Sequence, residues 1–168
     1  QELWRKVVEL GWTAASIPEK YQGLGLSYLN LCVIAEELGR SLAPIPFSSS
    51  VYLATESLIL YGSEEQRSSF LPRLASGELI GCFASDEIRT DSSLDGLQTN
   101  FSNGRVSGEK IPVADGGIAD FAIVLAKKED SNCSPFIVNL NSPEVERIPV
   151  KSIDPSRDQA KLVFHDAP

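Results

Sequence analysis

The sequence predicts an α+β protein, in which a helical N-terminal module at residues 1–78 is followed by an antiparallel β-barrel or sandwich domain at residues 79–168. Up to residue 78, apolar residues recur at the spacing of amphipathic helices. After it, short apolar runs are divided by Gly, Pro, Asp and Ser, which is typical of strands joined by turns. Helices followed by strands imply an α+β arrangement with a helical layer and a β layer.

Three helical segments are expected before residue 62. Residues 2–10 suggest the end of a helix, and residues 13–26 form a loop rich in Gly and Pro. A second helix follows at about 28–42, and Ala43-Pro44-Ile45-Pro46 stops it, because proline cannot donate a backbone bond and disfavours helix in its predecessor. A third helix runs from about 47 to 61. Apolar residues are expected on one face of each helix: Leu31, Ile34, Leu38 and Leu42 on the second, and Val51, Ala54, Leu58 and Tyr61 on the third.

The stretch from Gly62 to Glu87 carries a junction and a candidate site. Ser63 and Gln66 have the spacing of a capping box, which predicts a helix start, and Gly77 supplies the residue that most easily ends the helix in a left-handed conformation. The apolar run that follows, residues 79–84, fits a strand covered on both faces. The polar residues 85–87 then end the strand at the edge of a core, where ligand contacts are common. The alternative is an ordinary solvated strand end.

The second half of the chain is expected to be a set of strands. Asn103-Gly104 is a strong signal for a hairpin turn, because both residues tolerate positive φ angles. The predicted strands are 79–85, 97–101, 105–113, 120–127, 135–140, 145–150 and 160–165.

Composition excludes several classes of function. Fifteen basic and 23 acidic residues give a net charge of -8, which disfavours nucleic acid and anionic membranes as partners. The apolar runs are far below the roughly 18 residues that a membrane span needs, and no signal segment opens the chain. The three cysteines are odd in number and widely spaced, which suggests buried free thiols in a reducing compartment. A cytoplasmic protein is therefore expected.

Metal and nucleophilic chemistry are not indicated. The sequence contains one histidine, His165, and no zinc-binding motif of the C-x-x-C or H-E-x-x-H kind. A serine or cysteine hydrolase would need His165 as its base, yet this residue alternates with an apolar residue at an expected strand end. Gly23-x-Gly25 follows no strand, so a loop with positive φ angles is expected there rather than a nucleotide-binding loop.

Several motifs in the same order resemble the acyl-CoA dehydrogenase family over nearly the whole chain. The family pattern G-S-x-E-Q-(K/R)-x-x-x-L-P-x-L-(A/C)-x-G-E is matched from Gly62 to Glu78. Upstream, residues 17–26 resemble P-E-x-Y-G-G-L-G, and residues 36–40 resemble E-E-L-(G/A)-R. Downstream matches are Ser107-Gly108-Glu109-Lys110 to N-G-x-K, Ala119-Asp120 to A-D, and residues 162–168 to L-x-F-x-D-V-x-V-P.

The resemblance implies part of an N-terminal helical domain followed by a middle β domain. It also implies α,β-dehydrogenation of an acyl-CoA thioester, in which a glutamate removes the α-proton and flavin N5 accepts the β-hydrogen as hydride. The family's C-terminal helical domain, which usually carries this base, is absent. The chain is therefore interpreted as a fragment or a reduced homologue that is inactive alone, and no catalytic residue is assigned to it.

The family's flavin contacts fall on six positions of this sequence. Aligned on A-L-T-E-P-x-A-G-S-D and on the tryptophan-isoleucine-threonine motif, the candidate FAD-binding residues are Phe83, Ser85, Asp86, Ser92, Pro112 and Ala114. Three of them depart from the family pattern. Ionised Asp86 can only accept hydrogen bonds where the family threonine donates one, Pro112 cannot stack like an indole, and Ala114 lacks a hydroxyl.

Two hypotheses about function follow. The first is a flavin-dependent acyl-CoA dehydrogenase of the bacterial type that acts on branched, cyclic or steroid-derived thioesters, with FAD as cofactor and an electron-transfer acceptor as partner. The second is a non-catalytic partner subunit that does not bind flavin in a heteromeric dehydrogenase. Flavin monooxygenases and acyl-CoA oxidases of the same fold are a minor third possibility. A homo- or hetero-oligomer is expected in either case, since a helical domain cut at both ends leaves apolar surface to be covered.

Overall fold

The computed structural model describes residues 2–88, 96–130 and 132–168. The chain forms two compact units, Gln1–Gly81 and Cys82–Pro168, whereas the sequence analysis placed the division near residue 78. In the described part of the chain, none of the helices combines the length and the apolar character that a membrane crossing requires.

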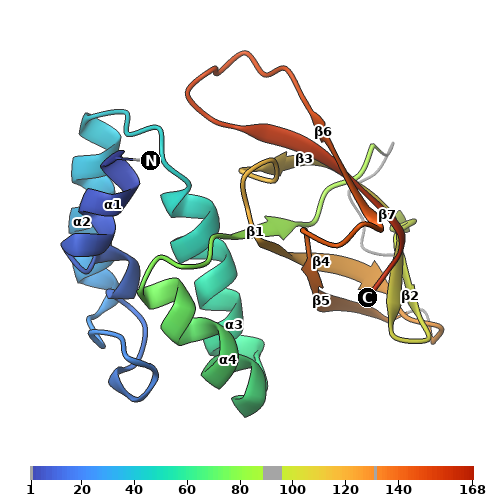
Figure 1. Cartoon of the computed structure of the whole chain (residues 1–168), viewed down its shortest axis with the longest axis horizontal. Helices are drawn as coiled ribbons and strands as arrows, with labels where there is room; N and C mark the ends of the chain where they lie inside the picture. The colour runs from blue at the N-terminus through green and yellow to red at the C-terminus, as the bar shows by residue number, and fades with distance from the viewer. Residues whose placement is uncertain (1, 89–95, 131) are drawn as a thin grey trace. The chain divides into compact units, whose positions relative to one another are not determined.

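The first unit is helical (Figure 1). Its elements are α1 (Glu2–Glu9), the 3₁₀ turns η1 (Trp12–Ala14) and η2 (Glu19–Tyr21), α2 (Tyr28–Arg40), the π-helix η3 (Ser48–Thr55), α3 (Glu56–Tyr61) and α4 (Glu64–Ala75). One core cluster joins the first of these elements to α2 and η3. It consists of Val7, Ala15, Leu31, Ile34, Ile45, Phe47 and Val51.

The capping box that the sequence predicts for α4 is confirmed. The Ser63 hydroxyl accepts the amide of Gln66 at 3.1 Å, and the Gln66 side chain accepts the amide of Ser63 at 2.8 Å. Gly77 lies just beyond the helix with φ of 69°, the left-handed stop that was expected.

Two details of the predicted helices are wrong. The single helix expected at 47–61 begins as the π-helix η3 and becomes α-helical only at α3, because the apolar spacing fits either winding in a short segment. At the ends of the predicted stripes, Leu42 and Tyr61 are 80% and 78% exposed, so they do not share the burial of Leu31 and Leu58. Leu42 lies beyond α2, which ends at Arg40, and its φ of 46° turns the chain out of the helix.

The second unit is built from strands. These are β1 (Gly81–Ala84), β2 (Asn100–Ser102), β3 (Arg105–Ala114), β4 (Phe121–Lys127), β5 (Cys133–Asn139), β6 (Val145–Pro149) and β7 (Gln159–Ala167). Each overlaps a predicted strand. The turn between β2 and β3 is the predicted Asn103-Gly104, whose φ angles of 51° and 78° are those of a tight hairpin.

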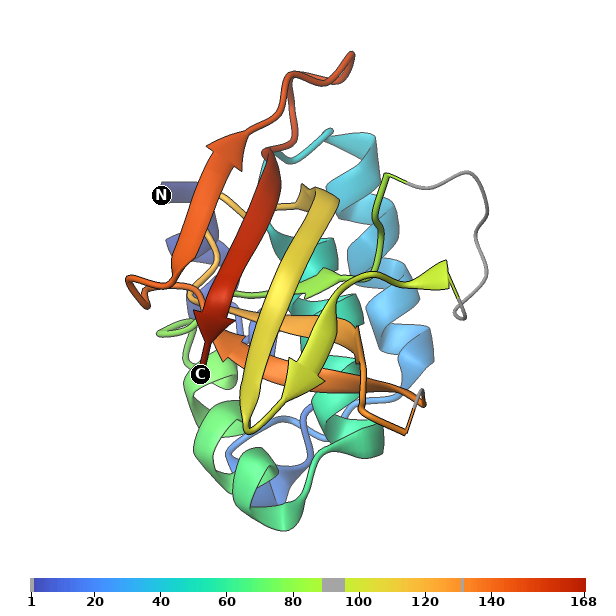
Figure 2. The ribbon, with the colours of Figure 1, turned by 90° about the vertical axis from the view of Figure 1, so that its right-hand side faces the viewer.

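The seven strands that the structure describes belong to one curled sheet of order β1-β4-β2-β3-β7-β6, with β5 paired to β4. Figure 2 shows β3 and β7 running at a steep angle to β4 and β5. The pairs β2–β3, β3–β7, β4–β5 and β6–β7 are antiparallel, whereas β2 meets β4 in a parallel bridge between Asn100 and Lys127. The β domain expected from the sequence is therefore confirmed as a half-barrel, but its sheet is mixed rather than purely antiparallel.

Candidate functional site

β1 separates its side chains into an inner and an outer set. Cys82 and Ala84 are fully buried, whereas Phe83 and the following Ser85 are half-buried, as the alternation of a strand requires. The expectation of a strand covered on both faces is therefore wrong. Two of the six candidate residues, Phe83 and Ser85, lie on the less covered face.

A β-bulge in β3 changes the direction of the side chains in the second candidate segment, residues 112–114. Lys110 pairs with Leu162 and Val113 pairs with Ala160, so three steps along β3 meet only two along β7. The extra residue reverses the alternation, because successive strand side chains point to opposite faces. Lys110 and Val113 are consequently both buried, while Pro112 is exposed and Ala114 half-buried.

The bulge also joins β3 to the end of β1. The amide of Ile111 donates to the carbonyl oxygen of Asp86 at 2.8 Å, which brings Asp86 next to Pro112. Phe83, Ser85, Asp86, Pro112 and Ala114 therefore lie on two joined segments with side chains directed away from the core. We call these five residues the bulged edge. The sixth candidate, Ser92, lies outside the described residues.

Asp86 is exposed at the strand end, and the Ser85 hydroxyl donates to its Oδ2 atom at 3.1 Å. The bulged edge thus presents one carboxylate acceptor beside the apolar surfaces of Pro112 and Ala114. Its one side-chain hydroxyl, that of Ser85, is already engaged with Asp86.

A buried ion pair lies directly behind the bulged edge. Lys110 Nζ is 2.7 Å from Glu87 Oε1, and the two side chains are 0% and 4% exposed. Lys110 also donates to the Ser85 carbonyl at 3.1 Å. The Glu87 carboxylate further accepts the amides of Gln98 and Thr99, at 2.7 and 3.1 Å, and the Thr99 hydroxyl, at 2.7 Å.

These contacts change the acidity of Glu87. Burial by itself would raise the pKa, but the hydrogen bonds from Lys110 and from the Gln98 and Thr99 groups outweigh burial and lower the pKa from 4.5 to about 2. The carboxylate is therefore ionised throughout the neutral range. Glu87 was expected only as part of the polar strand end, and its pairing with Lys110 was not predicted. The alternation along β3 is a signal for a buried Lys110, because it lies four residues after the buried Val106.

A second ion pair, between Asp115 and Arg157, lies directly after Ala114, the last candidate residue on β3. Asp115, with φ of 58° and a side chain 4% exposed, accepts from Arg157 Nη2 at 2.7 Å. Its amide donates to the Asp158 carbonyl at 2.9 Å, and the Asp158 carboxylate accepts the amide of Gly117 at 2.8 Å. The sequence analysis did not identify this pair, because its members are 42 residues apart.

Other groups considered in the sequence fall outside this site. All three thiols are free, but Cys32 is exposed, contrary to the expectation of buried cysteines. Burial, followed by the charge of Asp115, raises the pKa of Cys82 to about 12, so this thiol is a packing group and not a nucleophile. His165 is exposed, with Nε2 3.7 Å from Glu146. Among the described residues no group of three or more potential metal ligands comes together.

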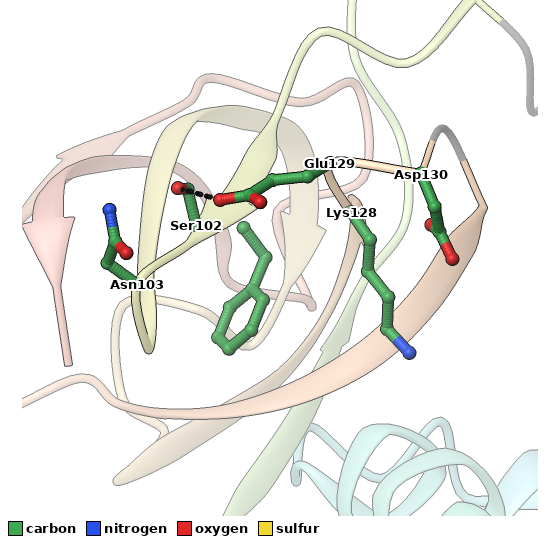
Figure 3. Close-up of a pocket in the computed structure, with 6 residues that line it drawn as sticks. Ser102, Asn103, Lys128, Glu129 and Asp130 are labelled. Carbon is green, nitrogen blue, oxygen red and sulfur yellow. Dashed lines mark hydrogen bonds between the residues drawn. The ribbon is translucent and has the colours of Figure 1, made fainter.

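A shallow hollow of about 450 Å³ lies at the opposite end of the β3 strand, beside the turn between β2 and β3. It is lined by Phe101, Ser102, Asn103, Lys128, Glu129 and Asp130. Figure 3 shows Glu129 directed at Ser102, whose hydroxyl donates to Glu129 Oε1 at 2.6 Å. None of the five candidate residues that the structure describes lines this hollow.

Comparison with known proteins decides the family. The family described as "Acyl-CoA dehydrogenase, N-terminal domain" matches residues 1–78. A probable acyl-CoA dehydrogenase of Bacillus subtilis is 32% identical over 154 residues, which cover 88% of this chain and 26% of that protein. The chain belongs to the acyl-CoA dehydrogenase family.

Solved structures of acyl-CoA dehydrogenases extend the likeness to the β unit. An acyl-CoA dehydrogenase from Bacillus anthracis complexed with FAD has a TM-score of 0.89 and 29% identity, covering 99% of this chain and 30% of that one. Butyryl-CoA dehydrogenase from Megasphaera elsdenii has a TM-score of 0.89 and 28% identity, covering 99% and 48%. The chain thus spans less than half the length of each of these relatives.

Proposed function

We propose that this chain forms the helical and middle β portions of a flavin-dependent acyl-CoA dehydrogenase, and that the bulged edge lies against FAD. The observation that carries the proposal is the bulge, because it turns Pro112 and Ala114 away from the core and joins them to Asp86. These are the positions at which the resemblance places flavin contacts. The relatives' names support the family chemistry, and the FAD-complexed relative supports the cofactor.

The shape of the bulged edge fits one side of a flat aromatic ring. Pro112, Ala114 and Phe83 offer apolar surface without charge. The hydrogen-bonding groups fit less well, because the flavin pyrimidine presents two carbonyl oxygens and N1 as acceptors, and an ionised carboxylate cannot donate to them. Asp86 could accept only the N3–H. Backbone amides must then supply the donors, and we expect weak FAD binding.

FAD bound there would supply a hydride acceptor for the β-hydrogen of an acyl-CoA. The residues of this chain would orient the ring and exclude water from one side of it. Asp86 would disfavour the reduced, negatively charged ring, because two like charges repel. No residue of the chain is assigned the role of the base. We also propose that the whole protein acts on an acyl-CoA thioester, passes electrons to an electron-transfer acceptor, forms an oligomer and is cytoplasmic.

A second candidate is a non-catalytic subunit that keeps the fold for assembly with a competent partner. It is favoured by the exposed carboxylate of Asp86 and by the missing hydroxyl at Ala114, since both remove donors from the bulged edge. Exposed apolar side chains on the helices, such as Leu29 at 75% and Val33 at 60%, support an assembly under either candidate.

FAD titration of the purified protein, followed by flavin fluorescence and visible absorption, separates the two candidates. We expect saturable but weak binding, together with no turnover of acyl-CoA thioesters when an artificial electron acceptor is present. An unperturbed flavin spectrum at saturating FAD would contradict the first candidate and leave the second. Turnover by the 168-residue chain alone would contradict the assignment of the base to a part of the protein beyond these residues.

A further inference from the structure

We infer that the buried Lys110–Glu87 pair is a positioning device that fixes the bulge of β3 against the end of β1. The inference concerns the backbone of the bulged edge, and its consequence for FAD rests on the proposed function. Three segments meet at the Glu87 carboxylate: β3 through Lys110, the end of β1 through Glu87 itself, and the segment before β2 through Gln98 and Thr99.

The bulge needs such a device. A shift of one residue in strand register moves every side chain to the opposite face, so a bulge without an anchor can relocate along the strand. Here a shift would turn Pro112 toward the core and Val113 outward. Lys110, the last regularly paired residue before the bulge, bonds both Glu87 and the Ser85 carbonyl, which fixes where the bulge begins.

The Ile111 amide reports directly on this geometry. Ile111 is next to Lys110 in the chain, and the hydrogen bond from its amide to the Asp86 carbonyl links the two segments of the bulged edge. If the pair holds the bulge in place, loss of Lys110 should open this link before the rest of the sheet opens, because local openings occur below the free energy of global unfolding.

Energetics favour a role in register besides the contribution of the pair to overall stability. Desolvation offsets much of the attraction within a buried pair, and fixing register is the best supported use of such groups. Lys110→Met should lower the overall stability, because it leaves the Glu87 carboxylate buried without its cation. The fold should persist, because Glu87 keeps three other donors, the Gln98 amide and the amide and hydroxyl of Thr99.

The test compares Lys110→Met with Lys161→Met, which removes the lysine of the more exposed Lys161–Glu109 pair between β7 and β3. Hydrogen exchange followed by NMR should show that Lys110→Met accelerates the exchange of the Ile111 amide by a factor about ten-fold or more above the factor for the amides of β4. FAD affinity should fall by a similar factor and the bound-flavin spectrum should move toward that of free FAD. Lys161→Met should change neither measurement.

If Lys110→Met accelerates the exchange of the Ile111 amide by the same factor as that of the β4 amides, the inference is overturned, because the pair would then act only on global stability. If Lys110→Met does not fold, the double variant Glu87→Gln/Lys110→Met, which leaves no buried charge, replaces it with the same expected result. Failure of the double variant to fold would also overturn the inference. If the unchanged protein binds no FAD, the proposed function fails while the exchange result still decides the role of the pair.

Discussion

Between about pH 5 and pH 2, protonation of Glu87 should reduce the free energy of unfolding by about 3 kcal/mol. The folded-state pKa is about 2, against 4.5 for an ordinary glutamate. Above pH 4.5 the group is ionised in both states and its full stabilisation is present. As the pH falls below 4.5 the unfolded state takes up the proton first, so the stabilisation is lost progressively until the pH passes the folded-state pKa.

Glu87→Gln isolates this contribution from the other carboxylates. Urea unfolding at a series of pH values should show the variant less stable than the unchanged protein by about 3 kcal/mol near neutrality, with the difference shrinking toward zero near about pH 2. Glu109→Gln is the matched control on the same strand, because it breaks the partly exposed pair with Lys161 and should cost less than about 1 kcal/mol. A difference for Glu87→Gln that does not vary with pH would contradict the account of its pKa.

Gly23→Ala should destabilise the helical unit by about 2–4 kcal/mol. A Cβ atom at residue 23 would lie 1.9 Å from the carbonyl oxygen of Ile17 and 2.5 Å from its Cβ. Ile17 is fully buried, and its carbonyl accepts the amide of Gly25 at 2.9 Å, so neither side can move without breaking the loop. Thermal or urea unfolding measures the loss.

Gly39→Ala is the control for this substitution. Gly39 lies in α2, its φ is not positive, and a Cβ atom added there would meet no other atom within 4 Å. Alanine there should stabilise the protein by about 0.5–1 kcal/mol, because glycine is the poorer helix former. Equal stability of Gly23→Ala and the unchanged protein would show that the Gly23–Leu24–Gly25 loop is not held as the structure has it.

Local signals in the sequence predicted much of the fold. The capping box of Ser63 and Gln66 and the Asn103-Gly104 turn depend on neighbouring residues, and both are confirmed. The sheet order and the parallel bridge between Asn100 and Lys127 were not predicted, because these pairings join segments far apart in the chain. The role of Gly23 was not predicted either. The sequence suggested positive φ angles in this loop, whereas the structure shows that Gly23 is required because its backbone lies close to Ile17.

Some residues of the candidate site were likewise predicted from the sequence, and others were not. The resemblance to the family's motifs selected Asp86, Pro112 and Ala114, and the structure places them on two joined segments, while their contact with FAD stays a prediction. The residues behind them were missed. Burial of Lys110 and Asp115 depends on the partners Glu87 and Arg157, which are distant in sequence, and on a bulge whose extra residue leaves no local signal.

The most direct test of the bulged edge as a flavin contact is FAD titration of Asp86→Thr beside the unchanged protein. Threonine would replace a carboxylate that can only accept with a hydroxyl that can donate to the flavin pyrimidine. A hydrogen bond of this kind contributes about 0.5–1.5 kcal/mol, so the account predicts a dissociation constant lower by several-fold. Asp130→Thr removes the same charge at the hollow of Figure 3 and should leave FAD affinity unchanged. Equal dissociation constants for Asp86→Thr and the unchanged protein would remove Asp86 from the flavin site.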